Sequence, residues 1–104
     1  MRATTYGQSY EGQRLGCAGY GVYRDADPTI AAVGPSRYAE WSCGTRLLVT
    51  GPAGSVEVIR QDSCPGCDSY GDPRFIDLSG AAHRAVCGAG TCRVTVQVMR
   101  GGWE

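Results

Sequence analysis

The sequence predicts a mainly β fold: a small barrel with one or two short helices, stapled by disulfides. Glycine supplies 16 of the 104 residues, about twice its usual share of roughly 7%, which favours a turn-rich β fold over a helical bundle. Several runs alternate between apolar and polar residues, as strands do. The six cysteines suit three disulfides. The length predicts one domain, residues 1–104.

The clearest strand prediction is the last one, over residues 92–100, where Val94, Val96 and Val98 alternate with polar residues and are expected to face the barrel interior. Two earlier runs, 46–50 and 55–61, are predicted to form a hairpin. The Gly-Pro-Ala-Gly break at 51–54 between them has turn chemistry. Shorter strands are expected over 3–6 and 29–33.

Helix is predicted in two short places. The run 79–86 is expected to form two turns, with Ser79 as the N-cap and the Cys87-Gly88 pair as the stop. A second short turn is expected over 35–41, because Pro35 suits a first helical position.

Charge and hydropathy exclude two classes of partner. Ten basic and ten acidic residues give a formal net charge of zero, so no basic field is present to hold phosphates and a nucleic-acid partner is disfavoured. No apolar run approaches the roughly 18 residues of a membrane span. We expect a monomer. The cysteine content favours a secreted protein whose signal peptide has been replaced by Met1 over a cytosolic one.

The cysteines allow three interpretations. Cys64, Cys67, Cys87 and Cys92 have the outline C-x2-C-x19-C-x4-C, which is close to zinc-ribbon spacing. A C-x-x-C pair could also be a redox site, but no βαβ pattern surrounds it. Structural disulfides are favoured for two reasons. A zinc site on these four cysteines would leave Cys17 and Cys43 unused, and a helix pattern lies between the two cysteine pairs, where a zinc ribbon would have a hairpin. No metal and no cofactor are therefore expected.

Two aspartates are the candidate chemical groups. Asp62 follows the 55–61 strand, and Asp77 lies between apolar residues, so both are expected to be half-buried. One interpretation is structural: Asp77 caps the helix near Ser79, or Asp62 ties down the Cys64 loop. The other is a polysaccharide site in which one carboxyl has a raised pKa and acts as an acid. The remaining loop aspartates are expected to be solvated: Asp25, Asp27, Asp68 and Asp72.

His83 is the only histidine, and we interpret it as exposed or structural rather than catalytic. No G-x-S-x-G elbow is present, so a Ser-His-Asp triad is not suggested. Tyrosine and tryptophan can stack on sugar rings, although most here are expected simply to cover the barrel. They are Tyr6, Tyr10, Tyr20, Tyr23, Tyr38, Tyr70, Trp41 and Trp103.

Six segments together resemble the double-psi β-barrel superfamily, which includes expansin domain 1, rare lipoprotein A, the loosenins, barwin and the family-45 endoglucanases. In chain order they are Ala3-Thr4-Thr5-Tyr6-Gly7, Gly16-Cys17-Ala18-Gly19-Tyr20-Gly21, Ile30-Ala31-Ala32-Val33, Trp41-Ser42-Cys43-Gly44-Thr45, Asp62-Ser63-Cys64-Pro65-Gly66-Cys67 and Ile76-Asp77-Leu78-Ser79. Each segment alone is a weak signal, but six in the family's order cover nearly the whole chain.

The resemblance implies a six-stranded barrel with an open polysaccharide groove. It carries the groove roles to Thr4, Asp62 and Asp77, and Tyr6 becomes a groove aromatic by the same match. Expansins often place an aromatic two residues after the first aspartate, and this chain has Cys64 there.

The resemblance also bears on catalysis and on the disulfides. The endoglucanases have a second catalytic aspartate near the N-terminal strand, and this chain has no acid in residues 4–8, so an ordinary two-carboxylate hydrolase is disfavoured. The expansin-like pattern suggests a Cys17–Cys43 disulfide. Of the 15 ways to pair six cysteines, we favour adding the local pairs Cys64–Cys67 and Cys87–Cys92.

Three functions stay open. The first is a secreted or cell-wall-associated expansin- or loosenin-like protein, which would bind and loosen cellulose, chitin or peptidoglycan without hydrolysis. The second is a lytic transglycosylase or atypical glycosidase acting through Asp77 or Asp62. The third is a secreted binding module that resembles a protease inhibitor.

Overall fold

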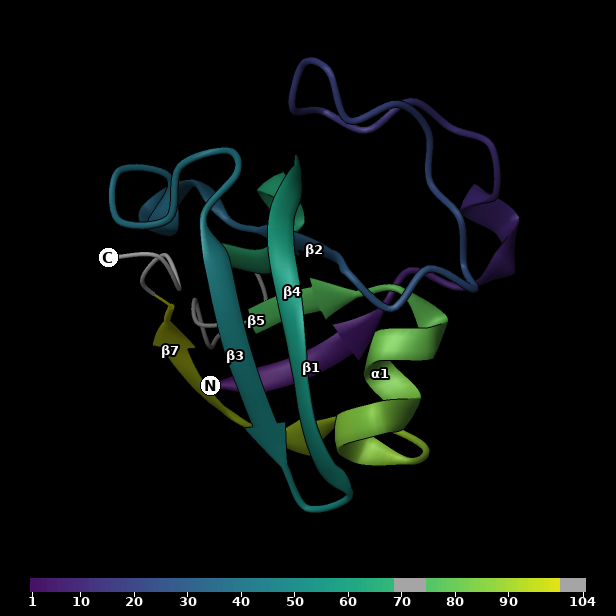
Figure 1. The fold of residues 1–104 in the computed structure, drawn as a ribbon, viewed down its shortest axis with the longest axis vertical. Coiled ribbons are helices and arrows are strands. Elements are labelled where there is room, and N and C mark those ends of the chain that lie inside the picture. Colours follow the sequence, from purple (N-terminus) through teal and green to yellow (C-terminus); the bar gives the residue numbers. More distant parts are fainter. Residues whose placement is uncertain (69–74, 100–104) are drawn as a thin grey trace.

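The computed structural model describes residues 1–68 and 75–99, and it is mainly β, as predicted (Figure 1). The strands are β1 (Arg2–Thr5), β2 (Ile30–Val33), β3 (Arg46–Gly51), β4 (Gly54–Ser63), β5 (Phe75–Leu78), β6 (Cys92–Arg93) and β7 (Thr95–Val98). The helices are α1 (Gly80–Cys87) and three single 3-10 turns, η1 (Gln8–Tyr10), η2 (Pro35–Arg37) and η3 (Pro65–Asp68).

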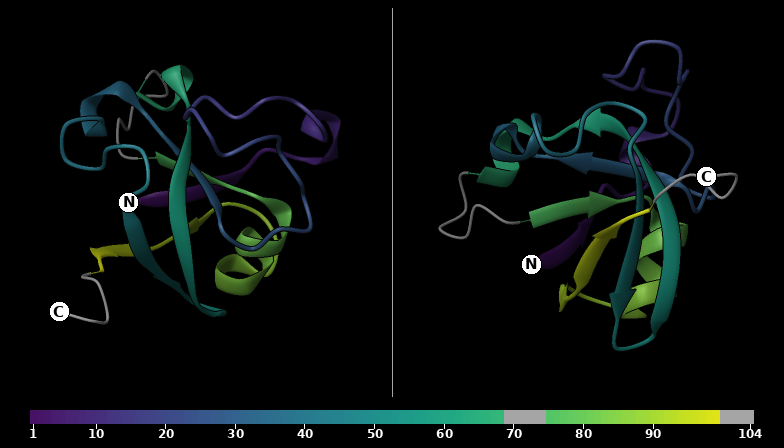
Figure 2. Two further views of the ribbon diagram at one scale, coloured as in Figure 1. Left: turned by 45° about the horizontal axis from the view of Figure 1, so that its top comes forward. Right: turned by 60° about the vertical axis from the view of Figure 1, so that its left-hand side comes forward.

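The strands form one mixed sheet in the order β6-β1-β5-β2-β4-β3-β7. Its two edges, β6 and β7, are consecutive in the chain and are separated only by Val94. The chain crosses from one edge of the sheet to the other at this residue, so the sheet is nearly closed into a barrel (Figure 2). The described residues hold seven strands rather than the predicted six, because the last predicted strand is divided at Val94.

The predicted hairpin is present as β3 and β4, which pair antiparallel from Arg46 opposite Ile59 to Gly51 opposite Gly54. Gly54 has a φ of 151°, in a region that L side chains rarely adopt. The alternation of the two strands turns Leu47, Val49 and Val58 inward, and all three are fully buried. They pack with residues of the other strands and of α1 in the main core.

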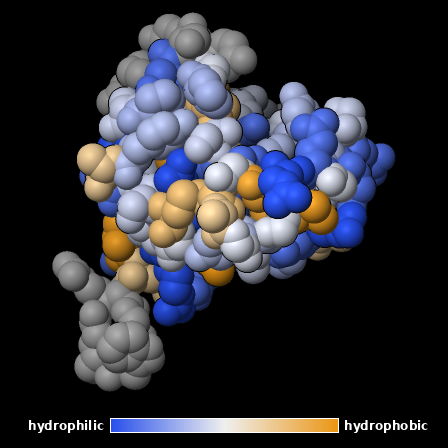
Figure 3. Space-filling model, turned by 90° about the horizontal axis from the view of Figure 1, so that it is seen from above, coloured by the Kyte–Doolittle hydropathy of each residue, from blue (hydrophilic) through white to orange (hydrophobic). Residues whose placement is uncertain are grey.

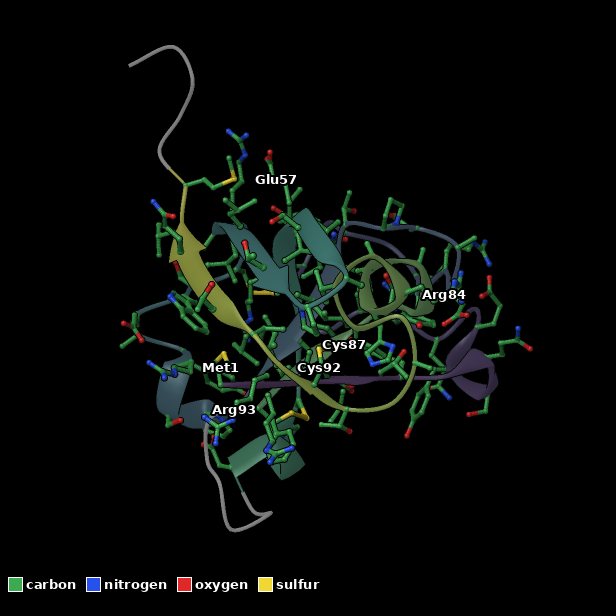
Figure 4. The ribbon with its side chains drawn as sticks, turned by 90° about the horizontal axis from the view of Figure 1, so that it is seen from below. Met1, Glu57, Arg84, Cys87, Cys92 and Arg93 are labelled. Carbon is green, nitrogen blue, oxygen red and sulfur yellow. A yellow bond between two sulfur atoms is a disulfide. The ribbon has the colours of Figure 1, made fainter. Side chains whose placement is uncertain are left out.

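The helix α1 lies against the barrel and begins and ends where the sequence predicts. The Ser79 hydroxyl accepts a hydrogen bond from the backbone N–H of Ala82 (3.4 Å), as an N-cap does. Gly88 follows the last turn with a φ of 74°, which favours glycine. In Figure 4, Cys87 at the end of α1 and Cys92 at the start of β6 face one another in a disulfide.

All six cysteines are paired, as Cys17–Cys43, Cys64–Cys67 and Cys87–Cys92. The favoured pairing is therefore confirmed. The four cysteines with zinc-ribbon spacing are joined to one another in two separate disulfides, which removes the thiolates that a zinc site would need.

The last strand departs from the prediction at its end. Val94 is 5% exposed and Val96 is half-buried against the core, but Val98 is 45% exposed. Alternation places all three valines on one face, and Val98 is the last residue of β7, where it pairs with Leu47 of β3. The predicted strand end at Arg100 lies outside the described residues, as do Tyr70, Asp72 and Trp103.

No helix within the described residues is long and apolar enough to cross a membrane. The face seen in Figure 3 is largely polar, with apolar areas mainly across its middle and at its left edge. The long connection between β1 and β2 extends away from the barrel at the upper right of Figure 1.

Candidate functional site

The strand register places both candidate aspartates in one row across the sheet. On β2, Ala32 lies opposite Asp62 of β4 on one side and opposite Asp77 of β5 on the other. Asp77 in turn lies opposite Thr4 of β1. Two strand spacings separate the two aspartates, or about 9–10 Å between Cα atoms. The small side chain of Ala32 leaves the space between the two carboxyl groups open.

A β-bulge gives Asp62 its direction. Along the β2–β4 pair, Ala31 lies opposite Arg60 and Ala32 opposite Asp62, so Gln61 is an extra residue on β4. In a regular strand, period-2 alternation would turn Asp62 to the same face as Arg60. A bulge changes that alternation. The Arg60 guanidinium donates from Nε to the backbone oxygen of Asp62 (2.9 Å) and so holds the bulge in place.

Asp62 is held by two donors from the N-terminal part of the chain. The Tyr6 hydroxyl donates to Oδ2 (2.8 Å) and the Gly16 backbone N–H donates to Oδ1 (2.6 Å). A Cβ on Gly16 would lie 2.8 Å from Oδ1, so a side chain there would displace the carboxylate. Both oxygens of Asp62 thus have fixed donors.

Asp77 has a different environment. The Thr4 hydroxyl donates to Oδ1 (2.9 Å), and half-burial removes much of the water that would stabilise a charged carboxylate. This desolvation is the main cause that raises the pKa of Asp77 to about 6. The Thr4 hydrogen bond and nearby His83 lower this pKa, whereas the charge of Asp62 raises it.

Tyr6 connects the two parts of the site. Its ring stacks on Tyr23 with centroids 4.3 Å apart, and Tyr10 meets it edge-to-face at 5.8 Å. Burial and the hydrogen bond to Asp62 raise the pKa of Tyr6 well above its ordinary value, so its hydroxyl stays a proton donor to Asp62. The sequence-predicted residues Thr4, Tyr6, Asp62 and Asp77 are therefore brought together.

These residues line two adjoining hollows on the barrel surface. One, of about 510 Å³, is lined by Thr4, Thr5, Tyr6, Tyr10, Cys64, Cys67, Phe75 and Asp77. The other includes Asp62 and is also lined by Gln13, Arg14, Ala32 and the 63–66 turn. They share Tyr6, Tyr10, Cys64 and Asp77, so the two hollows adjoin, and we refer to the pair as the groove. The larger volume falls within the range of small-molecule sites.

The structural interpretations of the two aspartates are not what the structure shows. The α1 N-cap is Ser79, and the N–H of Gly80 is bound by Asp25 (3.0 Å) rather than by Asp77. Within the described residues, the side-chain hydrogen bonds of Asp62 are made with Tyr6 and Gly16 rather than with the Cys64 loop.

Three aspartates expected to be solvated have structural hydrogen bonds instead. Asp25 accepts from Gly80 at the start of α1, as noted above. Asp27 accepts hydrogen bonds from the backbone N–H and the hydroxyl of Thr29. Asp68 accepts hydrogen bonds from the backbone N–H and the hydroxyl of Ser36. Loop position alone did not indicate these contacts, because each partner is set by the tertiary fold or by a local turn.

His83 is structural, as interpreted. It is 5% exposed, and its Nε2 lies 2.6 Å from the backbone oxygen of Gly90, so it ties α1 to the turn that follows. Among residues 1–68 and 75–99, no three His, Cys, Asp or Glu side chains gather as a metal site would require. The groove can therefore offer a ligand carboxylates, hydroxyls and aromatic rings.

Sequence reasoning did not assign Gly16, Arg14 or Tyr10 to the site. Gly16 contributes a backbone N–H, which has no sequence signal of its own. Arg14 and Tyr10 lie on the long connection between β1 and β2, whose path the sequence pattern does not specify.

Solved structures similar to this chain include two of the expansin of Clavibacter michiganensis. One is an aspartate-to-asparagine mutant in complex with cellohexaose, with a TM-score of 0.73 and 32% identity. The other is the apo protein, with a TM-score of 0.72 and 33% identity. Each match covers 95% of this chain and 48% of the expansin chain, so this chain spans about half the length of those relatives.

A papain inhibitor from Streptomyces also matches, with a TM-score of 0.70 and 22% identity over 95% of this chain and 91% of the inhibitor. At this identity the likeness shows a shared fold alone. No protein-family model matches the chain, and no curated protein sequence does either.

Proposed function

We propose that this chain, which belongs to the double-psi β-barrel superfamily and has the barrel of an expansin domain, binds a cell-wall polysaccharide in its groove without cleaving it. The observation that carries the proposal is the row of Thr4, Asp77 and Asp62 across adjoining strands, beside the hydroxyl of Tyr6. The similarity to an expansin solved with cellohexaose supports the same class of ligand.

The chemistry of the row suits a glycan. A sugar chain presents hydroxyl groups at regular intervals, and carboxylate oxygens accept charge-assisted hydrogen bonds from them. Two carboxylates separated by two strand spacings can bond hydroxyls of one extended chain. In a packed polymer these hydroxyls bond neighbouring chains, so binding them here would weaken that packing and loosen the polymer.

The position and fixed donors of Asp62 argue against a retaining hydrolase. A retaining mechanism needs a nucleophilic carboxylate about 5 Å from the acid, and Asp62 is anchored by Tyr6 and Gly16 on a strand two positions away from Asp77. The disulfides suit an oxidising, extracellular compartment, so we infer that the protein is secreted and acts at a cell wall.

One observation favours a second candidate, a lytic transglycosylase or atypical glycosidase. The pKa of Asp77 is raised to about 6, which suits a general acid near neutral pH. The papain inhibitor supports no corresponding argument for inhibition, since that likeness concerns the fold.

Binding and product analysis test the proposal directly. The protein is mixed with insoluble cellulose, chitin and peptidoglycan, and both depletion from solution and release of reducing ends or soluble fragments are measured. We expect depletion by at least one polymer with no product. If the wild type releases fragments and Asp77→Asn does not, the protein cleaves the polymer through Asp77 rather than only binding it. No depletion by any polymer would reject the proposed function.

Asp77→Asn also locates the binding site. The amide keeps the volume but is a weaker acceptor, so we expect affinity to fall about tenfold. The melting temperature at pH 7 should not fall, because the variant removes a half-buried charge. The control is Glu57→Gln, which changes an exposed carboxylate paired with Arg46 on β3 and β4. A lowered melting temperature with unchanged binding would make Asp77 structural only.

A further inference from the structure

Tyr10 is an exposed aromatic residue at the place where the two hollows of the groove meet. It lines both of them, together with Tyr6, Cys64 and Asp77. Its side chain is 45% exposed, although an aromatic side chain normally contributes to stability by being buried. An exposed ring that borders a groove on both sides has a free surface for a ligand.

The position of Tyr10 is fixed before any ligand binds. It is the last residue of η1, where its backbone N–H donates to the oxygen of Gly7 (3.4 Å) and its own oxygen accepts from Gln13 (3.0 Å). Its ring meets Tyr6 edge-to-face with an interplanar angle of 81°. Because a tyrosine side chain has only two rotatable angles, ordering it on binding has a small entropic cost.

The other groups at this junction are already engaged. Tyr6 is stacked on Tyr23 and its hydroxyl is bound to Asp62. Cys64 is held in the disulfide with Cys67. Asp77 offers a polar oxygen rather than an apolar surface. Tyr10 is therefore the residue shared by both hollows that can offer an open aromatic face.

We propose that Tyr10 is the stacking platform of the groove. The inference rests on the proposed function: Tyr10 packs against the apolar C–H face of one pyranose ring while the hydroxyls of a neighbouring unit bond Asp77 and Asp62. This division requires a linear glycan whose rings present flat faces along the chain. Tyr10 then sets the affinity for the ring face, and the carboxylates set the position of the chain.

Three variants test this assignment: Tyr10→Ala, Tyr10→Trp and the control Tyr20→Ala. Tyr20 is a matched control because it is 39% exposed and does not line either hollow. Affinity is measured by titration with cellohexaose and by depletion on whichever polymer the wild type binds. We expect Tyr10→Ala to weaken binding at least tenfold, Tyr10→Trp to retain or strengthen it, and Tyr20→Ala to leave it unchanged. Melting temperatures should differ little, since the Tyr10 ring is exposed.

The outcomes separate this inference from the proposed function. If the wild type binds and Asp77→Asn weakens binding while Tyr10→Ala does not, the groove binds glycan but Tyr10 is not its platform. If Tyr20→Ala loses as much affinity as Tyr10→Ala, the effect is not specific to the groove and the assignment is wrong. If the wild type binds neither cellohexaose nor any polymer, the proposed function fails and this inference fails with it.

Discussion

At the scale of single residues, the two groove aspartates differ because their surroundings differ. Asp62 is held by two donors, and Asp77 is bound by the Thr4 hydroxyl and is half-buried. Burial favours the neutral acid, so the folded protein holds a proton on Asp77 more tightly than the unfolded chain does. The site thus contains one fixed carboxylate and one carboxyl that titrates near neutral pH.

This difference predicts a titration. The Asp77 carboxyl carbon, followed by NMR, should titrate near pH 6, and Thr4→Val should raise the midpoint because the hydroxyl stabilises the ionised form. The folded pKa lies above the unfolded value of 3.8. The native state therefore binds more protons between about pH 4 and 6, and the free energy of unfolding should fall as pH rises through this window.

The control for the titration is Thr50→Val, which changes an exposed threonine at the far end of β3. It should leave the Asp77 midpoint unchanged. A midpoint near 3.8 in the wild type, or no change in Thr4→Val, would mean that Asp77 is better hydrated than the structure indicates.

Thr4, Tyr6, Asp62 and Asp77 could be proposed from the sequence as candidate residues, but their arrangement could not be predicted. The Asp-Leu-Ser motif and the end of the 55–61 strand identified Asp77 and Asp62. The extra residue Gln61, which turns Asp62 toward the groove, has no sequence signal because a bulge is defined by the partner strand. Tyr10 was treated as one of several surface tyrosines, since its exposure at a groove depends on the path of a long loop.

At the scale of elements, the last strand shows what alternation can and cannot predict. Period 2 correctly gave a face to Val94 and Val96, but it does not say how far along a strand the core extends. The chain changes partner at Val94, whose backbone N–H donates to the oxygen of Met1 (2.8 Å). Beyond it, β7 pairs with β3 as far as Val98, opposite Leu47, and Val98 is exposed at that end of the strand.

The burial of these valines predicts that a substitution by Asp is far more damaging at Val94 than at Val98. Val94→Asp would bury an unpaired carboxylate at the point where the barrel closes, so we expect no cooperative thermal unfolding transition. Val98→Asp places its charge at a 45% exposed position and should fold with a melting temperature close to that of the wild type. Circular dichroism melts of both variants decide this. A cooperative, wild-type-like melt of Val94→Asp would mean that β6 and β7 do not close the barrel.

At the scale of the whole molecule, the fold brings together strands that are far apart in the chain. Thr4 and Asp77 are neighbours although 73 positions separate them, and the row reaches Asp62 through Ala32 of β2. Two of the disulfides close chain segments of very different length near this row. Cys17–Cys43 spans 26 positions and Cys64–Cys67 spans three.

The two disulfides should therefore contribute differently to stability and to binding. In the chain-entropy model, closing a loop of this longer size stabilises the fold by about 3–4 kcal/mol, and closing the short one by less. Next to Cys17, the N–H of Gly16 binds Asp62, while Cys64 and Cys67 line the groove. We expect Cys17→Ala/Cys43→Ala to lower the free energy of unfolding by the larger amount.

The shorter disulfide is expected to act mainly on the groove. In Cys64→Ala/Cys67→Ala the barrel should remain nearly as stable, because little loop entropy is released. Polysaccharide binding should weaken, because the turn that forms one wall of the groove beside Tyr10 is no longer held. Denaturant unfolding and polymer depletion, measured on both double variants, separate the two effects. Equal losses of stability in the two double variants would contradict the loop-entropy argument. Wild-type binding without the Cys64–Cys67 bond would show that this wall keeps its shape without the disulfide.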